Sequence, residues 1–186
     1  RGLRRLEVSL DEHRPLVSRK VKTAPQPDGQ LAENEWPAEP QRVLAPVHNR
    51  QNRGAPNRRL IDPSNWNPQL YLQHDAEHLY LALRLPNKVD RRGQAYEWRK
   101  RTSGQDTSVW SDDSYEVFLS DADRQTVLHL GVSASGATYD ARYQENPGDE
   151  EAREDRSWNA EWTASATADK KAFVTEIAVP WTVLEK

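Results

Sequence analysis

The stretch that decides the fold is Trp110-Ser111-Asp112-Asp113-Ser114-Tyr115-Glu116-Val117-Phe118-Leu119-Ser120-Asp121. It begins as a polar, acidic turn and continues as the two-residue alternation that is typical of a β-strand. Because successive side chains of a strand point to opposite sheet faces, we expect two separate sets. The set predicted to face a core is Tyr115, Val117 and Leu119. The set predicted on the opposite face is Glu116, Phe118 and Ser120.

An indole and a carboxylate are expected close together at the start of this strand. Trp110 lies on the turn that leads into the strand, and Glu116 lies on its outward face. A sugar ring packs its C–H groups on an aromatic face and donates its hydroxyls to an acid. The alternative is a buried loop tryptophan beside a solvated glutamate. Three further loop tryptophans are candidate partners for a sugar: Trp66, Trp98 and Trp158.

The composition is that of one hydrophilic domain. A chain of 186 residues can bury a core, and its 30% of charged residues indicates that much of it is loop. The formal net charge of −3 argues against a general nucleic-acid binder, since phosphate neutralisation needs a basic excess. The absence of cysteine excludes disulfides, a thiolate nucleophile and a cysteine zinc site.

The ends and the hydropathy of the chain suggest an exported protein. No apolar run approaches the ~20 residues of a membrane span. The sequence begins with Arg1 and contains no methionine, so we expect that an export signal has been removed. Residues 1–24 have only weak alternation and are predicted to be an N-terminal extension. Residues 25–186 are predicted to form one module.

Short strands separated by polar turns fill most of this module. The clearest hairpin has alternating leucines before and after the turn at residues 74–77. Residues 31–36 are predicted to form one helical turn that Pro37 ends, and residues 40–68, 88–104 and 144–157 to be loops. Further strands are expected at residues 126–132, 137–141, 161–167 and 172–179, with a helical turn after Pro180. This pattern predicts an all-β fold, an antiparallel β-sandwich with long loops.

Five short motifs in order resemble those of family 9 carbohydrate-binding modules and their DOMON-like relatives. Asp28 to Trp36 resembles "DGxLxExxW", and residues 74–82 resemble the "xDxxxLYxA" hairpin. Residues 110–119 are similar to "WxxDSxEVFL", and residues 133–140 to "NxxGxxYD". Glu176 to Leu184 matches "EIxIPWxxL". Two positions depart from the pattern, because Ser133 stands where asparagine is expected and Gly131 where such modules can place arginine.

The resemblance implies a jelly-roll-like sandwich that is one module of a larger exported bacterial protein. It implies a polysaccharide or oligosaccharide ligand, often a chain end clamped between two tryptophans, with structural calcium nearby. Trp110 and Glu116 fall on the positions of one clamp tryptophan and its carboxylate. The second clamp tryptophan belongs to strands after the "IPW" motif. Either another segment completes the sandwich, or further strands follow Lys186.

Other chemistries are less well supported by the residues. Glycoside hydrolysis needs two carboxylates ~5 to 10 Å apart, and Asp112, Asp113 and Glu116 on one turn do not predict that pair, so we expect no enzyme. Calcium needs several loop oxygens, which four acids could supply: Asp112, Asp113, Asp121 and Asp123. Solvated turn residues explain the same acids equally well. Some DOMON-like relatives carry haem, but without methionine only His129 is a candidate ligand, and no haem is expected.

The sequence is therefore compatible with two hypotheses about function. The first is a non-catalytic carbohydrate-binding module centred on Trp110 and Glu116. The second is a β-sandwich that serves structure or protein contacts in a larger exported protein, in which these two residues pack. Trp36 and Trp181 are predicted in both cases to plug the ends of the sandwich.

Overall fold

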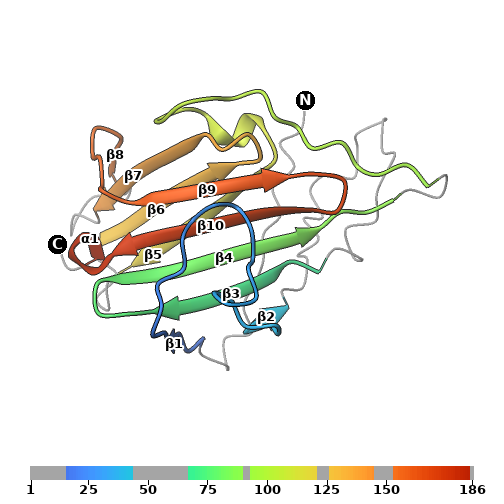
Figure 1. The fold of residues 1–186 in the computed structure, drawn as a ribbon. Coiled ribbons are helices and arrows are strands. Elements are labelled where there is room, and N and C mark those ends of the chain that lie inside the picture. Colours follow the sequence, from blue (N-terminus) through green and yellow to red (C-terminus); the bar gives the residue numbers. More distant parts are fainter. Residues whose placement is uncertain (1–15, 44–66, 90–92, 121–125, 145–152, 185–186) are drawn as a thin grey trace.

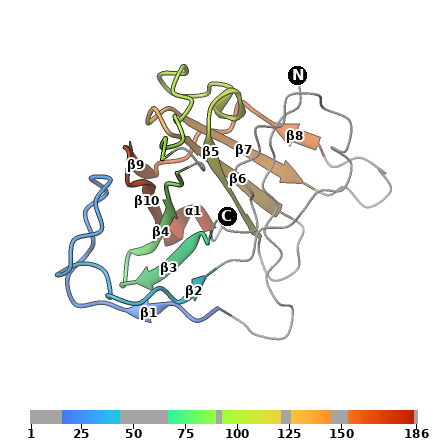
Figure 2. The ribbon, with the colours of Figure 1, turned by 90° about the vertical axis from the view of Figure 1, so that its right-hand side faces the viewer.

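The computed structural model describes residues 16–43, 67–89, 93–120, 126–144 and 153–184, and these form two packed β-sheets (Figures 1 and 2). The larger sheet has the strand order β1-β3-β4-β10-β9, with β2 also paired to β3. Its strands are β1 (Arg19–Lys20), β2 (Arg42–Val43), β3 (Gln69–His74), β4 (His78–Pro86), β9 (Thr163–Ala168) and β10 (Ala172–Pro180). All of its pairings are antiparallel except that of β1 with β3.

The smaller sheet is an antiparallel meander of the order β5-β6-β7-β8. Its strands are β5 (Ser114–Ser120), β6 (Thr126–Ser133), β7 (Thr138–Gln144) and β8 (Arg153–Asp155). A 3-10 helix, η3 (Val109–Ser111), precedes β5, and the short helix α1 (Trp181–Leu184) follows β10. The prediction of an all-β antiparallel sandwich is therefore confirmed.

The main core lies between the two sheets and follows the alternation of the strands. Leu81 on β4 and Ile177 on β10 pack in one buried cluster with Leu130 and Val132 of β6. Val117 and Leu119 of β5 pack against the same cluster. The inward and outward sets predicted for β5 thus lie on the predicted faces. Because these side chains are shielded from water on both sides, this layer provides the main hydrophobic stabilisation.

The segment between β1 and β2 covers the outer face of the larger sheet (Figure 1). Trp36 from this segment is 4% exposed and packs with Tyr71, Tyr80 and Ala178 of the sheet. The predicted helical turn is present, since the Trp36 N–H donates to the Ala32 carbonyl at 2.9 Å. Trp36 is thus a core residue as predicted, but it seals a sheet face rather than an end of the sandwich.

A buried carboxylate fastens this cover to the sheet. Glu176 on β10 is fully buried, and its Oε2 accepts the backbone N–H groups of residues 28, 29 and 30 at 3.1, 2.7 and 3.0 Å. Its Oε1 accepts the Trp36 indole N–H at 2.5 Å. Burial raises the pKa of Glu176, while these donors favour its ionised form. The motif at residues 28–36 and the motif at residues 176–184 are therefore in direct contact in the fold.

The close contact of the cover with β9 requires glycine at position 29. Gly29 has φ +84°, a region that favours glycine, and a Cβ there would lie 2.8 Å from Thr167 Cγ2. The Thr167 hydroxyl also donates to the Gly29 carbonyl at 2.6 Å. The turn predicted at residues 28–29 is thus the point at which the cover contacts β9.

The edge of the larger sheet at β3 is occupied along its length. β2 pairs with residues 69–70, and β1 pairs with residues 73–74. Between them the Gln41 side chain acts as a further partner, because its Oε1 accepts the Leu72 N–H at 2.9 Å and its Nε2 donates to the Leu72 carbonyl. Part of the segment predicted as an N-terminal extension, from Arg19 onward, thus belongs to the sheet and its cover.

Candidate functional site

The outer face of the smaller sheet carries the residues that the sequence singled out. In the strand register Glu116 of β5 lies opposite Gly131 of β6, which lies opposite Tyr139 of β7. On the next rung of the same face Phe118 lies opposite His129, and His129 opposite Ala141. Tyr143 of β7 pairs with Glu154 of β8 at the far edge. We call this set of side chains the aromatic face; it comprises Glu116, Phe118, His129, Tyr139, Tyr143 and Glu154, together with Trp110.

An exposed aromatic ring lies at the β5 side of the aromatic face. Phe118 is 51% exposed, although it is a large hydrophobic residue on a regular strand. Its ring stacks on the His129 imidazole with centroids 4.2 Å apart and planes 18° from parallel. His129 itself is 5% exposed and also contacts the rings of Tyr139 and Tyr143, at 5.2 and 6.2 Å. The Phe118 ring is therefore supported from below and open to solvent.

Glu116 is fixed beside this ring by His129. Glu116 Oε2 lies 3.0 Å from His129 Nε2, and the side chains are 33% and 7% exposed. With an ionised Glu116, the imidazole Nε2 is the donor of this hydrogen bond. His129 Nδ1 is buried and has no hydrogen-bond partner among the described residues. The pair therefore holds a partly exposed carboxylate in one orientation next to the Phe118 ring.

Trp110 borders the aromatic face from the loop side. Trp110 follows Val109, which packs on Gly131 of β6. A Cβ added at Gly131 would lie 2.7 Å from Val109 Cγ2, so only glycine at this position allows η3 to approach the sheet this closely. The Trp110 ring meets the Tyr139 ring edge to face, with centroids 5.0 Å apart and planes at 80°. Trp110 is partly buried. Trp110 and Glu116 thus lie on the same sheet face, as predicted, and the indole is not sealed in the interior.

A second carboxylate lies at the β8 side of the aromatic face. Glu154 Oε1 accepts the hydroxyls of Tyr139 and Tyr143 at 2.6 and 2.9 Å, and its Oε2 accepts Arg156 Nε at 2.7 Å. The Arg156 hydrogen bond, followed by that of Tyr139, lowers the pKa of Glu154 to about 2. Burial and the Glu154 carboxylate raise the pKa of Tyr143 to about 12. The Arg156 side chain is 67% exposed, so its guanidinium faces solvent. We call Glu154 and Arg156 the second polar station of the face.

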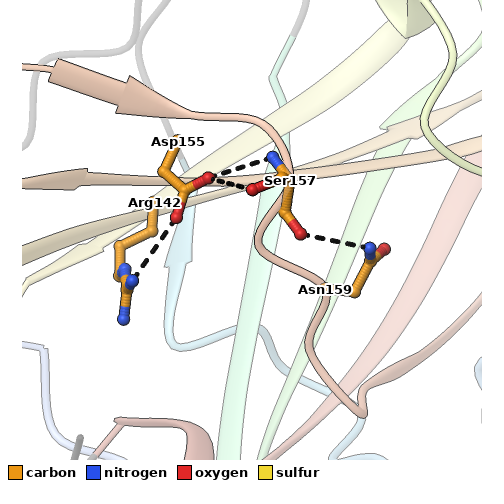
Figure 3. Close-up of polar contacts among 4 residues, drawn as sticks. All are labelled: Arg142, Asp155, Ser157 and Asn159. Carbon is orange, nitrogen blue, oxygen red and sulfur yellow. Dashed lines mark hydrogen bonds and ion pairs between the residues drawn. The ribbon is translucent and has the colours of Figure 1, made fainter.

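The turn after β8 holds this second station in place (Figure 3). Asp155 Oδ1 accepts the Ser157 N–H at 3.1 Å and the Ser157 hydroxyl at 2.7 Å, and Asp155 Oδ2 lies 3.4 Å from Arg142 NH2. The Ser157 carbonyl in turn accepts the Asn159 amide at 3.4 Å. The Ser157 hydroxyl, together with the Arg142 charge, lowers the pKa of Asp155. Asp155 lies between Glu154 and Arg156 in sequence, so these contacts fix the backbone that carries both.

The other tryptophan candidates lie elsewhere. Trp98 packs on Phe173 of the larger sheet at 5.8 Å, and its indole N–H donates to the Asp169 carbonyl at 2.6 Å. Trp158 packs against the core cluster between the two sheets that contains Leu130. It therefore lies on the inner face of the smaller sheet, whereas Trp110 lies on the outer face. Trp66 lies outside the described residues. The structure therefore does not bring Trp98 or Trp158 to the aromatic face. Trp181, predicted at an end of the sandwich, donates its indole N–H to the Asp75 carbonyl in the β3–β4 turn at 3.1 Å.

Two of the four predicted calcium ligands, Asp112 and Asp113, lie in the described part of the chain. Asp112 Oδ2 accepts the N–H groups of Arg101 and Thr102 at 2.7 and 2.8 Å and the Thr102 hydroxyl at 2.7 Å. Burial opposes ionisation of Asp112, but these hydrogen bonds outweigh it and lower its pKa. Asp113 Oδ2 accepts the Arg99 N–H at 2.7 Å. Asp121 and Asp123 lie outside the described residues, and within the described part no three acidic or histidine side chains form a metal-ligand group.

An open depression of about 380 Å³ lies beside β1, away from the aromatic face. It is lined by both signs of charge, including Arg19, Lys20, Lys22, Glu33 and Glu35. It has Trp36 as its aromatic component, and this ring is buried. The exposed members of the aromatic face, Glu116 and Phe118, thus lie on the sheet surface and not in this depression.

Sequence reasoning gave no sugar-binding role to five members of the aromatic face: Phe118, His129, Tyr139, Tyr143 and Glu154. Phe118 was placed on the correct face by its alternation with Val117, and its exposure was the signal that the sequence could not supply. Glu154 and the neighbouring Arg156 were missed because residues 144–157 were predicted to be a loop, and Tyr143 because the preceding strand was predicted to end at residue 141. The structure has β8 there, and its pairing with β7 brings Glu154 opposite Tyr143.

Comparisons with known proteins support the fold. No family model matches the chain, and no curated protein matches its sequence significantly. A solved structure from Bacteroides uniformis, described on a provisional basis as a carbohydrate-binding protein, superposes with a TM-score of 0.58 at 12% identity. The match covers 90% of this chain and 73% of that protein. At this identity the likeness establishes a common sandwich fold. Within the described residues no helix is long and apolar enough to cross a membrane.

Proposed function

We propose that this chain is a non-catalytic carbohydrate-binding module whose ligand binds to the aromatic face of the smaller sheet. The observation that carries the proposal is the exposed Phe118 ring, supported by His129 and adjacent to the fixed Glu116 carboxylate. Phe118 is the one aromatic residue classed as exposed in the part of the chain that the structure describes, and it lies beside an oriented acid.

The chemistry of the aromatic face suits a saccharide. A pyranose ring can lay its C–H groups on the face of the exposed Phe118 ring. The exposed part of the Glu116 carboxylate can accept a hydroxyl in a charge-assisted hydrogen bond. Trp110, at the border of the face, offers a further indole contact. This arrangement places the stacking and accepting groups on rigid strands, which reduces the entropy lost on binding.

The two carboxylates of the face are suited to binding rather than to hydrolysis. A glycosidase needs a carboxylic acid with a raised pKa to protonate the leaving oxygen. The pKa of Glu154 is instead lowered to about 2, and both of its oxygens already accept hydrogen bonds. Glu116 is paired with an imidazole. Glu154 is therefore not in an environment that keeps a proton at neutral pH.

The wider setting of the module is proposed from the sequence and the fold. The five motifs support a relation to family 9 or DOMON-like modules, and the structural neighbour is provisionally described as a carbohydrate-binding protein. We extend the proposal to export, to a place in a larger protein, and to structural calcium near Asp112 and Asp113. The alternative role as a structural or protein-contact module would use the same exposed Phe118 ring.

The test is titration of a glycan panel, with mono-, oligo- and acidic sugars, followed by intrinsic fluorescence and calorimetry. Phe118→Ala and Trp110→Ala are expected to weaken binding at least about tenfold and about threefold, respectively, because one ring is open and the other is partly buried. Val43→Ala, an exposed apolar residue on the other sheet, is the matched control. Absence of binding to every sugar would contradict the proposal and favour the protein-contact role.

A further inference from the structure

The geometry points to a specific binding mode: the aromatic face binds an internal stretch of an extended oligosaccharide, lying across the strands, rather than a single sugar or a chain end. This inference rests on the proposed function and specifies its ligand. It follows from the positions of the two polar stations, Glu116 with Phe118 at one side and Glu154 with Arg156 at the other.

The two stations lie too far apart for one sugar ring. Glu116 is on β5 and Glu154 on β8, three inter-strand steps apart in the order β5-β6-β7-β8, or ~14 Å at the usual strand spacing. Along the strands, Glu116 is level with Tyr139 and Glu154 with Tyr143, a shift of four residues or ~13 Å. The diagonal between the two backbone positions is therefore about 19 Å. The side chains shorten this separation, because the hydroxyl of Tyr139, the residue level with Glu116, donates to Glu154 Oε1 at 2.6 Å. A pyranose unit with bonds of ~1.5 Å is about 5 Å long, so a chain of up to about four units spans the face.

Aromatic rings connect the two stations without interruption. Phe118 stacks on His129, and His129 contacts both Tyr139 and Tyr143 at 5.2 and 6.2 Å. The hydroxyls of both tyrosines reach Glu154. His129 and Tyr139 are only 5% and 4% exposed, so a chain on this diagonal would contact the exposed Phe118 ring and the partly buried Trp110 and Tyr143 rings that surround them.

Each station lies at an edge of the described sheet. β5 and β8 are the two outermost strands, and the exposed groups at the edges are the 51% exposed Phe118 and the 67% exposed Arg156 side chain. A chain that crosses the face can thus continue past either edge. A chain-end site instead encloses one terminal sugar, and within the described residues the Phe118 ring contacts an aromatic partner, His129, on its inner side.

The charge of the face favours a neutral chain. Glu116 and Glu154 are both carboxylates, and the Arg156 guanidinium already contacts Glu154 through two nitrogens, at 2.7 Å each. An acidic chain would place its own carboxylates beside these acids and would be repelled. Uncharged hydroxyls can donate to Glu116 and accept from the exposed Arg156 guanidinium.

The experiment measures affinity against chain length with neutral probes: cello-, xylo-, manno- and chito-oligosaccharides of one to six units. For the series that binds, affinity should rise at least about tenfold from two units to four and then level off, since the fourth unit reaches the second station. Borohydride reduction of the terminal sugar of the hexamer should change its affinity less than about twofold, because the chain end lies outside the face.

Two variants separate the stations. Phe118→Ala should weaken binding of every length, whereas Arg156→Gln should weaken the tetramer at least about threefold more than the dimer. Arg19→Gln, which removes an exposed cation on β1 of the other sheet, is the matched control, and circular dichroism verifies that each variant is folded. A monosaccharide that binds as tightly as the tetramer, or a large loss on end reduction, would overturn this inference and leave the proposed function standing. Absence of binding to any neutral or acidic sugar would overturn the proposed function itself.

Discussion

The outer faces of the two sheets are built from the same kinds of side chain but differ in what covers them. On the larger sheet, Trp36, Tyr71 and Tyr80 pack on the face that carries Glu176, and all four are almost fully buried. On the smaller sheet, rings and a carboxylate also share a face, yet Phe118 is 51% and the Glu116 side chain 33% exposed. An aromatic ring beside an acid is therefore no functional signal by itself.

The difference lies in how the acid is satisfied. Glu176 accepts four donors, three from the backbone at residues 28–30 and one from Trp36, so its hydrogen-bonding capacity is used to attach the cover. Glu116 is held by His129 from the side and keeps an exposed surface. We infer that the first acid serves the fold and the second serves binding. The following predictions test this assignment.

The largest expected effect is on stability at Glu176. Glu176→Ala should lower the free energy of unfolding by about 4 kcal/mol, because it leaves several buried donors without an acceptor. Glu116→Ala is the matched control on the other face and should cost less than about 1 kcal/mol, since a partly exposed ion pair contributes little. Urea denaturation measures both. Equal losses in the two variants would contradict the assignment.

The next effect concerns the docking turn of the cover. Gly29→Ala should destabilise the protein by about 2–3 kcal/mol, because it combines a left-handed backbone with a Cβ only 2.8 Å from Thr167 Cγ2. Gly136 has the same φ of +84° but open space around it, so Gly136→Ala should cost only about 1 kcal/mol. If thermal denaturation gives the same loss of stability for both variants, the close contact between the cover and β9 does not contribute to the stability of the protein.

The smallest effect is the acid dependence of the second station. The pKa of Glu154 is lowered to about 2 from an ordinary value of 4.5, so the unfolded chain binds more protons between these values. The stability from this carboxylate is therefore fully present above pH 4.5 and is lost as the pH falls towards 2. Glu154→Gln should flatten this part of the profile of melting temperature against pH. An unchanged slope would show that the contacts to Tyr139, Tyr143 and Arg156 do not hold in solution.

Local alternation was sufficient to predict the parts of the fold that depend on neighbours in sequence. It assigned Val117 and Leu119 to the core and Glu116 and Phe118 to the opposite face, and it placed the main hairpins and the sandwich class. These properties follow from the two-residue period of a strand with one buried face. The position of Trp110 beside the same face followed from its short distance in sequence to β5.

Long-range pairing decided the features that the sequence could not supply. Residues 153–155 have an acidic, irregular sequence, and they form β8 only because β7 offers an edge. The role of Glu176 required knowledge that residues 28–36 fold back over β10, some 140 residues later in the chain. Exposure of Phe118 likewise depends on whether any segment covers it. Contacts between distant segments therefore determined which ring and acid remain open.

The most direct test of the central claim is mapping of a bound oligosaccharide by NMR. Amide shifts would be followed while a neutral tetrasaccharide from the binding series is added. We predict that the perturbed amides fall on β5 to β8, around residues 116–118, 129, 139–143 and 154–156. Perturbations centred on residues 19–37 or on the larger sheet, with the aromatic face unaffected, would contradict the account.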